Sequence, residues 1–128
     1  KGFFHAHTFS VHPIGCTAAL AGIALLSSKE IVDGRQNIER LHSGFREDIH
    51  NHPKVSNARN LGVILAIDLN IDISRYGNTR DKLYQFFVKR GIVLRPLGNT
   101  IYILPPYVIT SKQLNKIYAA IKELLDTL

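Results

Sequence analysis

Residues 62–69 (GVILAIDL) constrain the fold more than any other stretch, because their side chains are almost all apolar. A strand with one face in water alternates apolar and polar residues, whereas a strand covered on both faces does not. We therefore expect residues 55–69 to form one extended segment. Its core would be covered on both sides or paired at the centre of a sheet.

Two helical patterns precede this segment. Pro13 suits the first turn of a helix, and small or apolar residues follow it at helical spacing. A second helix is predicted by the spacing of Ile38, Leu41, Phe45 and Ile49. Asp33 and Gly34 favour a break, so we expect the boundary between the two helices near residues 30–34. The second helix should end before Pro53, because the residue preceding a proline avoids the helical conformation.

The remaining sequence predicts two helices with two short strands between them. Asn78 is a candidate N-cap for a helix that stops at Gly91. Residues 92–94 and 101–104 predict strands joined by a turn. Thr110 and Gln113 have the spacing of a capping box at the start of the last helix.

This order of elements indicates the α/β class, as a two-layer α+β unit with helices on one side of a small, mainly antiparallel sheet. Residues 31–128 fit such a unit. Residues 1–30 fit it less well, and we interpret them as an arm and a connecting helix that lead to a body outside this sequence.

Charge, apolar runs and cysteine content limit the classes of partner and the location that we expect for this protein. Sixteen basic and ten acidic residues give a net charge of +6, but the basic residues are scattered and no nucleic-acid motif accompanies them. We therefore expect no nucleic-acid partner. The longest nearly apolar run, residues 16–26, is too short to span a bilayer, so we expect no membrane partner. A single cysteine and no secretory signal favour a cytoplasmic location.

Metal and catalytic motifs are weak. His5, His7 and His12 lie close in sequence but lack a nearby acidic or cysteine ligand, so we expect no metal site. Asp68 has no partner carboxylate for paired acid and base chemistry. We expect no catalytic residue in this sequence.

Two residues point to anion binding. Thr8 lies a few residues before a predicted helix start, where hydroxyl and backbone N–H groups bind phosphate; a threonine in such a place also simply caps or turns the chain. Arg95 closes a predicted strand beside a turn. An arginine there binds a carboxylate through two parallel hydrogen bonds, or forms an ion pair with an acid of its own chain.

The sequence also resembles a known family. His5-Ala6-His7-Thr8-Phe9, followed by residues 12–19 (HPIGCTAA), resembles the H-G-x-[ST]-[FY]…N-P-x-x-C-A-A-A stretch of class III pyridoxal-phosphate aminotransferases. Residues 59–64 (RNLGVI) look like their VRxLG strand. Residues 95–107 (RPLGNTIYILPPY) are similar to the RPxGxxIYxxPPY signature of one subfamily, which acts in biotin biosynthesis.

The resemblance implies the C-terminal small domain of a fold-type-I enzyme that uses pyridoxal 5'-phosphate, with residues 1–30 as the interdomain arm. It implies a homodimer in which Thr8 binds the cofactor phosphate of the neighbouring subunit. It also implies that Arg95 binds the carboxylate of a keto-acid substrate and that Tyr102 lines the same pocket. Ala6 and His12 depart from the family pattern, which has glycine and asparagine at these positions.

The family's cofactor-binding lysine lies upstream of the Thr8 motif, so the resemblance predicts that this stretch alone is inactive. The implied reaction passes an amino group from a small-molecule donor to 8-amino-7-oxononanoate. Two alternatives remain open: another class III ω-aminotransferase with a different acceptor, and a non-catalytic α/β module that binds an anionic partner through its basic surface.

Overall fold

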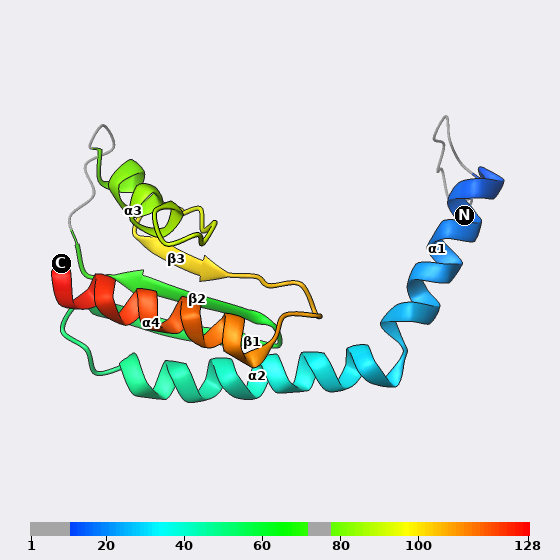
Figure 1. Cartoon of the computed structure of the whole chain (residues 1–128), viewed down its shortest axis with the longest axis horizontal. Coiled ribbons are helices and arrows are strands. Elements are labelled where there is room, and N and C mark those ends of the chain that lie inside the picture. Colours follow the sequence, from blue (N-terminus) through cyan, green and yellow to red (C-terminus); the bar gives the residue numbers. More distant parts are fainter. Residues whose placement is uncertain (1–10, 72–77) are drawn as a thin grey trace, which may run out of the picture. The chain divides into compact units, whose positions relative to one another are not determined.

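A computed structural model describes residues 11–71 and 78–128 of the chain. The chain divides into two compact units, Lys1–Val32 and Asp33–Leu128. Four helices and three strands are formed by the described residues (Figure 1). In chain order they are α1 (Pro13–Leu26), α2 (Lys29–Ile49), β1 (Val55–Leu61), β2 (Ile64–Leu69), α3 (Thr79–Val88), β3 (Thr100–Ile103) and α4 (Ser111–Thr127).

Helix α1 begins at Pro13, as predicted. The ring nitrogen Nδ1 of His12, the N-cap residue, accepts a hydrogen bond from the backbone N–H of Gly15 at 3.3 Å. None of the α1 side chains is buried by the described part of the chain, although the helix is apolar on all sides. Such a helix is normally covered by other protein.

The break between α1 and α2 lies at residues 27–28, so the prediction of a break near residues 30–34 was wrong. Ser28 starts α2 by accepting a hydrogen bond from the N–H of Ile31. Gly34 lies inside α2 for a packing reason: a Cβ there would lie 2.7 Å from the backbone oxygen of Tyr107. The glycine is a point of close approach, not a helix breaker.

The expected single extended segment is instead a hairpin of β1 and β2. The two strands pair antiparallel, and Leu61 faces Ile64 across a two-residue loop. Gly62 in this loop has a φ of +55°, a conformation that costs glycine little. The turn was not evident from the sequence, because its two residues, Gly62 and Val63, continue directly into the apolar run of β2.

Strand β2 lies at the centre of a three-stranded antiparallel sheet in the order β1-β2-β3. Central pairing was one of the two expected arrangements. One face of the sheet carries the buried residues Leu65, Ile67, Leu69, Ile101 and Ile103. The opposite face, which we call the open face, exposes Ile64 and carries polar groups.

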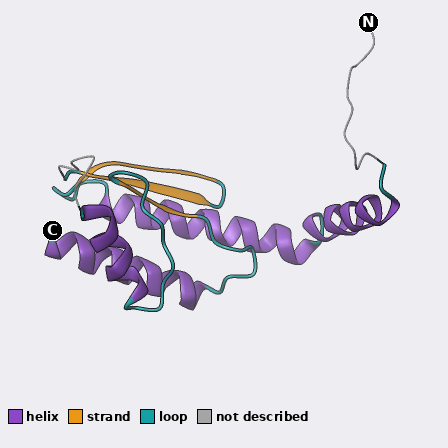
Figure 2. Cartoon of the chain, turned by 90° about the horizontal axis from the view of Figure 1, so that it is seen from above, coloured by secondary structure: helices purple, strands orange, loops and turns teal. Residues whose placement is uncertain are grey.

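The helices of the second unit lie on one side of the sheet, which confirms the predicted fold class (Figure 2). Helix α2 buries Ile38, Phe45 and Ile49, and α4 buries Leu114, Ile121 and Leu124 against the same core. The capping box at the start of α4 is also confirmed. The hydroxyl of Thr110 accepts from the N–H of Gln113, and the Gln113 side chain accepts from the N–H of Thr110.

Residues 92–94 do not form the predicted strand. The only pair that closes the loop before β3 is Leu97 with Thr100, whose N–H groups each donate to the carbonyl of the other at 2.9 and 3.0 Å. Within the described residues, no further backbone hydrogen bond joins residues 92–96 to β3. We call residues 91–97 the first arm and residues 100–104 the second arm of this splayed hairpin.

Within the described residues no single helix has the length and apolar character to cross a membrane. The consecutive helices α1 and α2 reach that threshold only when they are taken together, as a broken pair and by length and composition alone.

Candidate functional site

Arg95 lies on the first arm of the splayed hairpin. Its neighbours Leu94 and Pro96 are buried, whereas Arg95 itself is exposed, so the alternation along the arm turns its side chain away from the core. No residue in 11–71 or 78–128 forms an ion pair or a hydrogen bond with its guanidinium. The other possibility for this residue, an ion pair with an acid of its own chain, is therefore not formed with any described residue.

Arg95 lines a cavity of about 390 Å³. Helix α3 supplies three of its lining residues, and the first arm supplies two. The lining consists of Arg80, Asp81, Tyr84, Arg95 and Pro96. Arg80 pairs with Asp81 at 3.3 Å, so the net positive charge of the cavity comes from Arg95.

Tyr102 lies in β3 on the open face and is 37% exposed. The register places Arg59, Ala66 and Tyr102 in one row across the three strands. In this row the short side chain of Ala66 lies between the longer side chains of Arg59 and Tyr102. The predicted pair of binding residues thus comes from the two arms of one hairpin.

Arg59 on the open face is committed to a structural pair. It donates a hydrogen bond to Asp68, and the hydroxyl of Thr100 donates to the other carboxylate oxygen of Asp68 at 2.7 Å. The hydrogen bond from Arg59, helped by that from Thr100, lowers the pKa of Asp68 below its usual value. Asp68 of β2 is therefore bonded to both neighbouring strands, to β1 through Arg59 and to β3 through Thr100, and is not a free acid.

Thr8, the predicted phosphate ligand, lies outside the described residues, as do His5 and His7. Among the residues that the structure describes, no group of three or more histidine, cysteine or acidic side chains is arranged to hold a metal ion.

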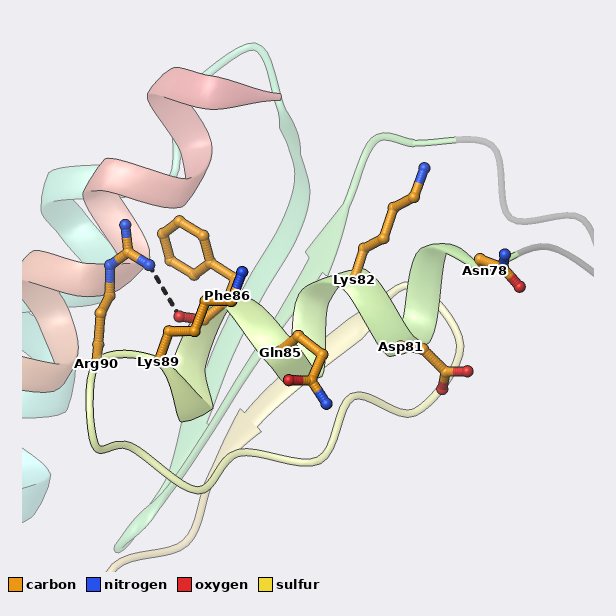
Figure 3. A pocket seen from close by; sticks show the side chains of 7 residues that line it. All are labelled: Asn78, Asp81, Lys82, Gln85, Phe86, Lys89 and Arg90. Atoms are coloured by element: carbon orange, nitrogen blue, oxygen red, sulfur yellow. Dashed lines mark hydrogen bonds between the residues drawn. The ribbon is translucent and has the colours of Figure 1, made fainter.

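A second cavity, about 660 Å³, lies along α3 and is lined by residues between Asn78 and Arg90 (Figure 3). The labelled side chains of Asp81, Lys82 and Gln85 point to different sides of the helix and do not converge on one point. Arg90, just beyond the end of α3, donates hydrogen bonds to Glu123 of α4 and to the carbonyl of Phe86. Its guanidinium carbon lies 3.5 Å from the centre of the Phe86 ring. This surface is an open helix face, so it does not compete with the Arg95 cavity as a site.

Sequence reasoning missed His42, the one polar residue buried in the core of the described chain. Its Nδ1 lies 2.6 Å from the hydroxyl of Tyr118, and its Nε2 lies 3.1 Å from the carbonyl oxygen of Val63. Burial lowers the pKa of His42. Its position between Ile38 and Phe45 on the apolar stripe of α2 was the available signal. His42 joins α2, α4 and the β1–β2 loop, and it lines neither of the two cavities described above.

Comparison with known proteins gives consistent matches. The model of the aminotransferase class-III family matches residues 1–125. The chain is 42% identical over 125 residues to adenosylmethionine-8-amino-7-oxononanoate aminotransferase of Synechococcus elongatus, covering 97% of this chain and 29% of the relative. It is 29% identical to the enzyme of the same name from Helicobacter pylori, covering 100% of this chain and 30% of the relative.

A more distant relative is putrescine–pyruvate aminotransferase of Pseudomonas aeruginosa, 27% identical, with 97% of this chain and 28% of the relative covered. Among solved structures, a PMP-bound aminotransferase from Vibrio fluvialis superposes with a TM-score of 0.84 at 21% identity, covering 98% of this chain and 29% of that one. An omega-aminotransferase from Paracoccus denitrificans gives the same TM-score at 22% identity and the same coverage. The chain thus spans less than a third of the length of the proteins it matches.

Proposed function

The chain belongs to the class III aminotransferases, and from this premise we propose that the whole protein transfers an amino group to the ketone of 8-amino-7-oxononanoate, giving 7,8-diaminononanoate in biotin biosynthesis. The 42% identity to a relative named for this substrate supports the proposal. So does the hairpin sequence of residues 95–107, which carries the motif similar to that of the biotin-pathway subfamily.

The observation that carries the proposal is the exposed Arg95 guanidinium, which has no acidic partner among the described residues. We assign it to the carboxylate of the keto acid. A planar guanidinium binds a carboxylate through two parallel hydrogen bonds and thereby fixes its orientation as well as its position. Binding energy gained at this distant end of the substrate then helps to position the ketone at the reacting centre. Tyr102, on the other arm, is proposed to line the same pocket.

Pyridoxal 5'-phosphate is the cofactor of this family and supplies the carrier for the amino group. Of the residues of this chain, we assign Thr8 to the phosphate end of the cofactor, as the resemblance implies. In the family that this chain resembles, the lysine that binds the cofactor aldehyde lies upstream of the Thr8 motif, and no lysine of this chain matches it. We therefore place the cofactor-binding lysine elsewhere in the whole protein.

Three further proposals rest on the same family. The whole protein is a cytoplasmic homodimer, and Thr8 of one subunit holds the cofactor phosphate of the other. The present stretch is inactive alone, because it lacks that lysine. The apolar helix α1 has no buried side chain among the described residues, which supports the proposal that this stretch belongs to a larger protein.

The decisive experiment is Arg95→Gln in the full-length enzyme. The KM for 8-amino-7-oxononanoate should rise about 10- to 100-fold, the range expected when charged hydrogen bonds are lost, with little change in pyridoxal phosphate affinity. Arg46→Gln is the control, since Arg46 lies on α2, pairs with its sequence neighbour Glu47 and does not line the Arg95 cavity. Unchanged kinetics for Arg95→Gln would reject the assigned role.

A second candidate is an ω-aminotransferase with another acceptor, which the similarity to putrescine–pyruvate aminotransferase favours. Parallel assays with 8-amino-7-oxononanoate and pyruvate separate the two. A kcat/KM that is higher for pyruvate would favour the second candidate.

The inactivity of the isolated stretch has its own test. Pyridoxal phosphate and borohydride are added to the 128-residue chain, and the products are mapped by mass spectrometry. We expect no specific lysine adduct. A stoichiometric adduct at one lysine would contradict the proposal.

A further inference from the structure

Arg95 is not the only hydrogen-bond donor in its cavity that lacks a partner. Tyr84 of α3 lines the same cavity, and its hydroxyl makes no hydrogen bond with any residue in 11–71 or 78–128. Two donors on different elements, one charged and one neutral, therefore share one cavity. A site with unpaired donors is suited to an acceptor from outside the chain.

The other two charged side chains that line the cavity, Arg80 and Asp81, form an ion pair with each other. Both Nε and Nη2 of Arg80 lie 3.3–3.4 Å from one carboxylate oxygen of Asp81. Among the described residues that line the cavity, two guanidiniums and one carboxylate give a single net positive charge. This charge balance matches a monoanion with planar oxygens, such as a carboxylate, better than a doubly charged phosphate.

Tyr84 is also held in a suitable place. It lies three and four residues beyond Asp81 and Arg80, so the three side chains share one face of α3. The preceding residue, Leu83, is buried in the core and fixes the helix against the first arm that carries Arg95. A phenol has few rotatable bonds, so little conformational entropy is lost when it binds.

We propose that Tyr84 is a second carboxylate-binding residue, whose hydroxyl donates a hydrogen bond to the same keto-acid carboxylate that Arg95 binds. This inference rests on the proposed function and deepens it. Arg95 supplies the charge, and Tyr84 supplies a neutral donor whose hydrogen bond to an ionised carboxylate is stronger than its hydrogen bond to an uncharged carbonyl.

The test is Tyr84→Phe in the full-length holoenzyme, which removes one oxygen atom from a partly exposed ring. The KM for 8-amino-7-oxononanoate should rise about fivefold to tenfold with kcat within about twofold of wild type. The carbonyl of the methyl ester accepts a weaker hydrogen bond than the ionised carboxylate, so its KM should rise less than the KM for the acid. Tyr107→Phe is the control, because the Tyr107 ring lies beside Arg35 of α2 and outside the cavity.

The outcomes separate this inference from the proposed function. If Arg95→Gln raises the KM and Tyr84→Phe does not, the role of Tyr84 is rejected and the proposed function stands. An equal rise for acid and ester in Tyr84→Phe indicates a structural effect and also rejects it. If Arg95→Gln leaves the KM unchanged, both assignments fail.

Discussion

Arg95 and Tyr102 occupy corresponding positions on the two arms of one hairpin, each two residues from the closing pair Leu97 and Thr100. In a regular hairpin they would face each other across the ladder. Here the ladder ends at the closing pair, and within the described residues no backbone hydrogen bond joins Arg95 to Tyr102. The open ladder leaves Arg95 beside α3 and Tyr102 on the open face of the sheet, and Tyr102 is not among the described residues that line the Arg95 cavity.

Arg95→Lys separates charge from geometry in the full-length enzyme. Lysine keeps the positive charge but loses the planar fork that binds both carboxylate oxygens. We expect the KM for the keto acid to rise about tenfold, less than for Arg95→Gln, because roughly one charged hydrogen bond is lost. Steady-state kinetics with a saturating amino donor measures the effect. A lysine variant as poor as the glutamine variant would show that charge contributes nothing.

The fold was predictable where a local signal and tertiary packing agree. Pro13 and the Thr110 capping box mark helix starts that the structure confirms. Gly34 and Gly62 show the limit. The glycine that looked like a helix break is a packing contact, and the glycine inside an apolar run is a turn. The sequence pattern does not tell these roles apart, because each depends on which distant backbone lies nearby.

The candidate site was predictable only in part. A motif identified Arg95 and Tyr102, but no sequence signal placed Tyr84 beside Arg95, since the two are separated by the first arm and by half of a helix. His42 was missed for a related reason. A histidine on a helical apolar stripe is assigned to the core only when its partners, here Tyr118 and Val63, are known.

Gly98→Ala tests whether the loop of the splayed hairpin requires a glycine at position 98. Gly98 has a φ of +61° at the first of two loop residues, as a type II′ turn requires. Alanine is strained there, and we expect a loss of about 1 kcal/mol in the free energy of unfolding. Urea denaturation of the 128-residue chain measures it. The same substitution at Gly22, in the middle of α1 and with open space around its Cβ position, should be neutral or stabilising.

Asp68→Asn tests the cross-strand pair. The variant loses the ion pair with Arg59, and we expect a cost of about 1 kcal/mol at pH 7, because the Arg59 side chain is more than half exposed and its charge is screened. The pKa of Asp68 is lowered in the folded state, so this contribution is present above the unfolded value of 3.8 and disappears as the pH falls through the lower folded value. Asp126→Asn, at an exposed position, is the control. Equal destabilisation of the two variants would contradict the prediction.

His42 predicts the pH dependence of stability. The carbonyl of Val63 only accepts, so Nε2 carries the proton, and Nδ1 accepts the Tyr118 hydroxyl hydrogen. A protonated ring would place a second N–H against that hydroxyl inside the core. The unfolded histidine, with the ordinary value of 6.5, therefore binds a proton more readily than the folded one, whose pKa burial lowers. The free energy of unfolding should fall as the pH drops below about 6.5, with a slope of up to about 1.4 kcal/mol per pH unit until the folded pKa is reached.

Chemical denaturation of the 128-residue chain between pH 7.5 and pH 5, in steps of about half a unit, measures this slope. His42→Gln should be less stable at pH 7.5 by about 1–3 kcal/mol, because a buried hydrogen-bond network is disturbed, and it should lose most of the slope. His50→Gln, at an exposed position just after α2, should keep the wild-type slope. If His42→Gln keeps the slope as well, the pH dependence arises from another group, and the buried imidazole does not control it.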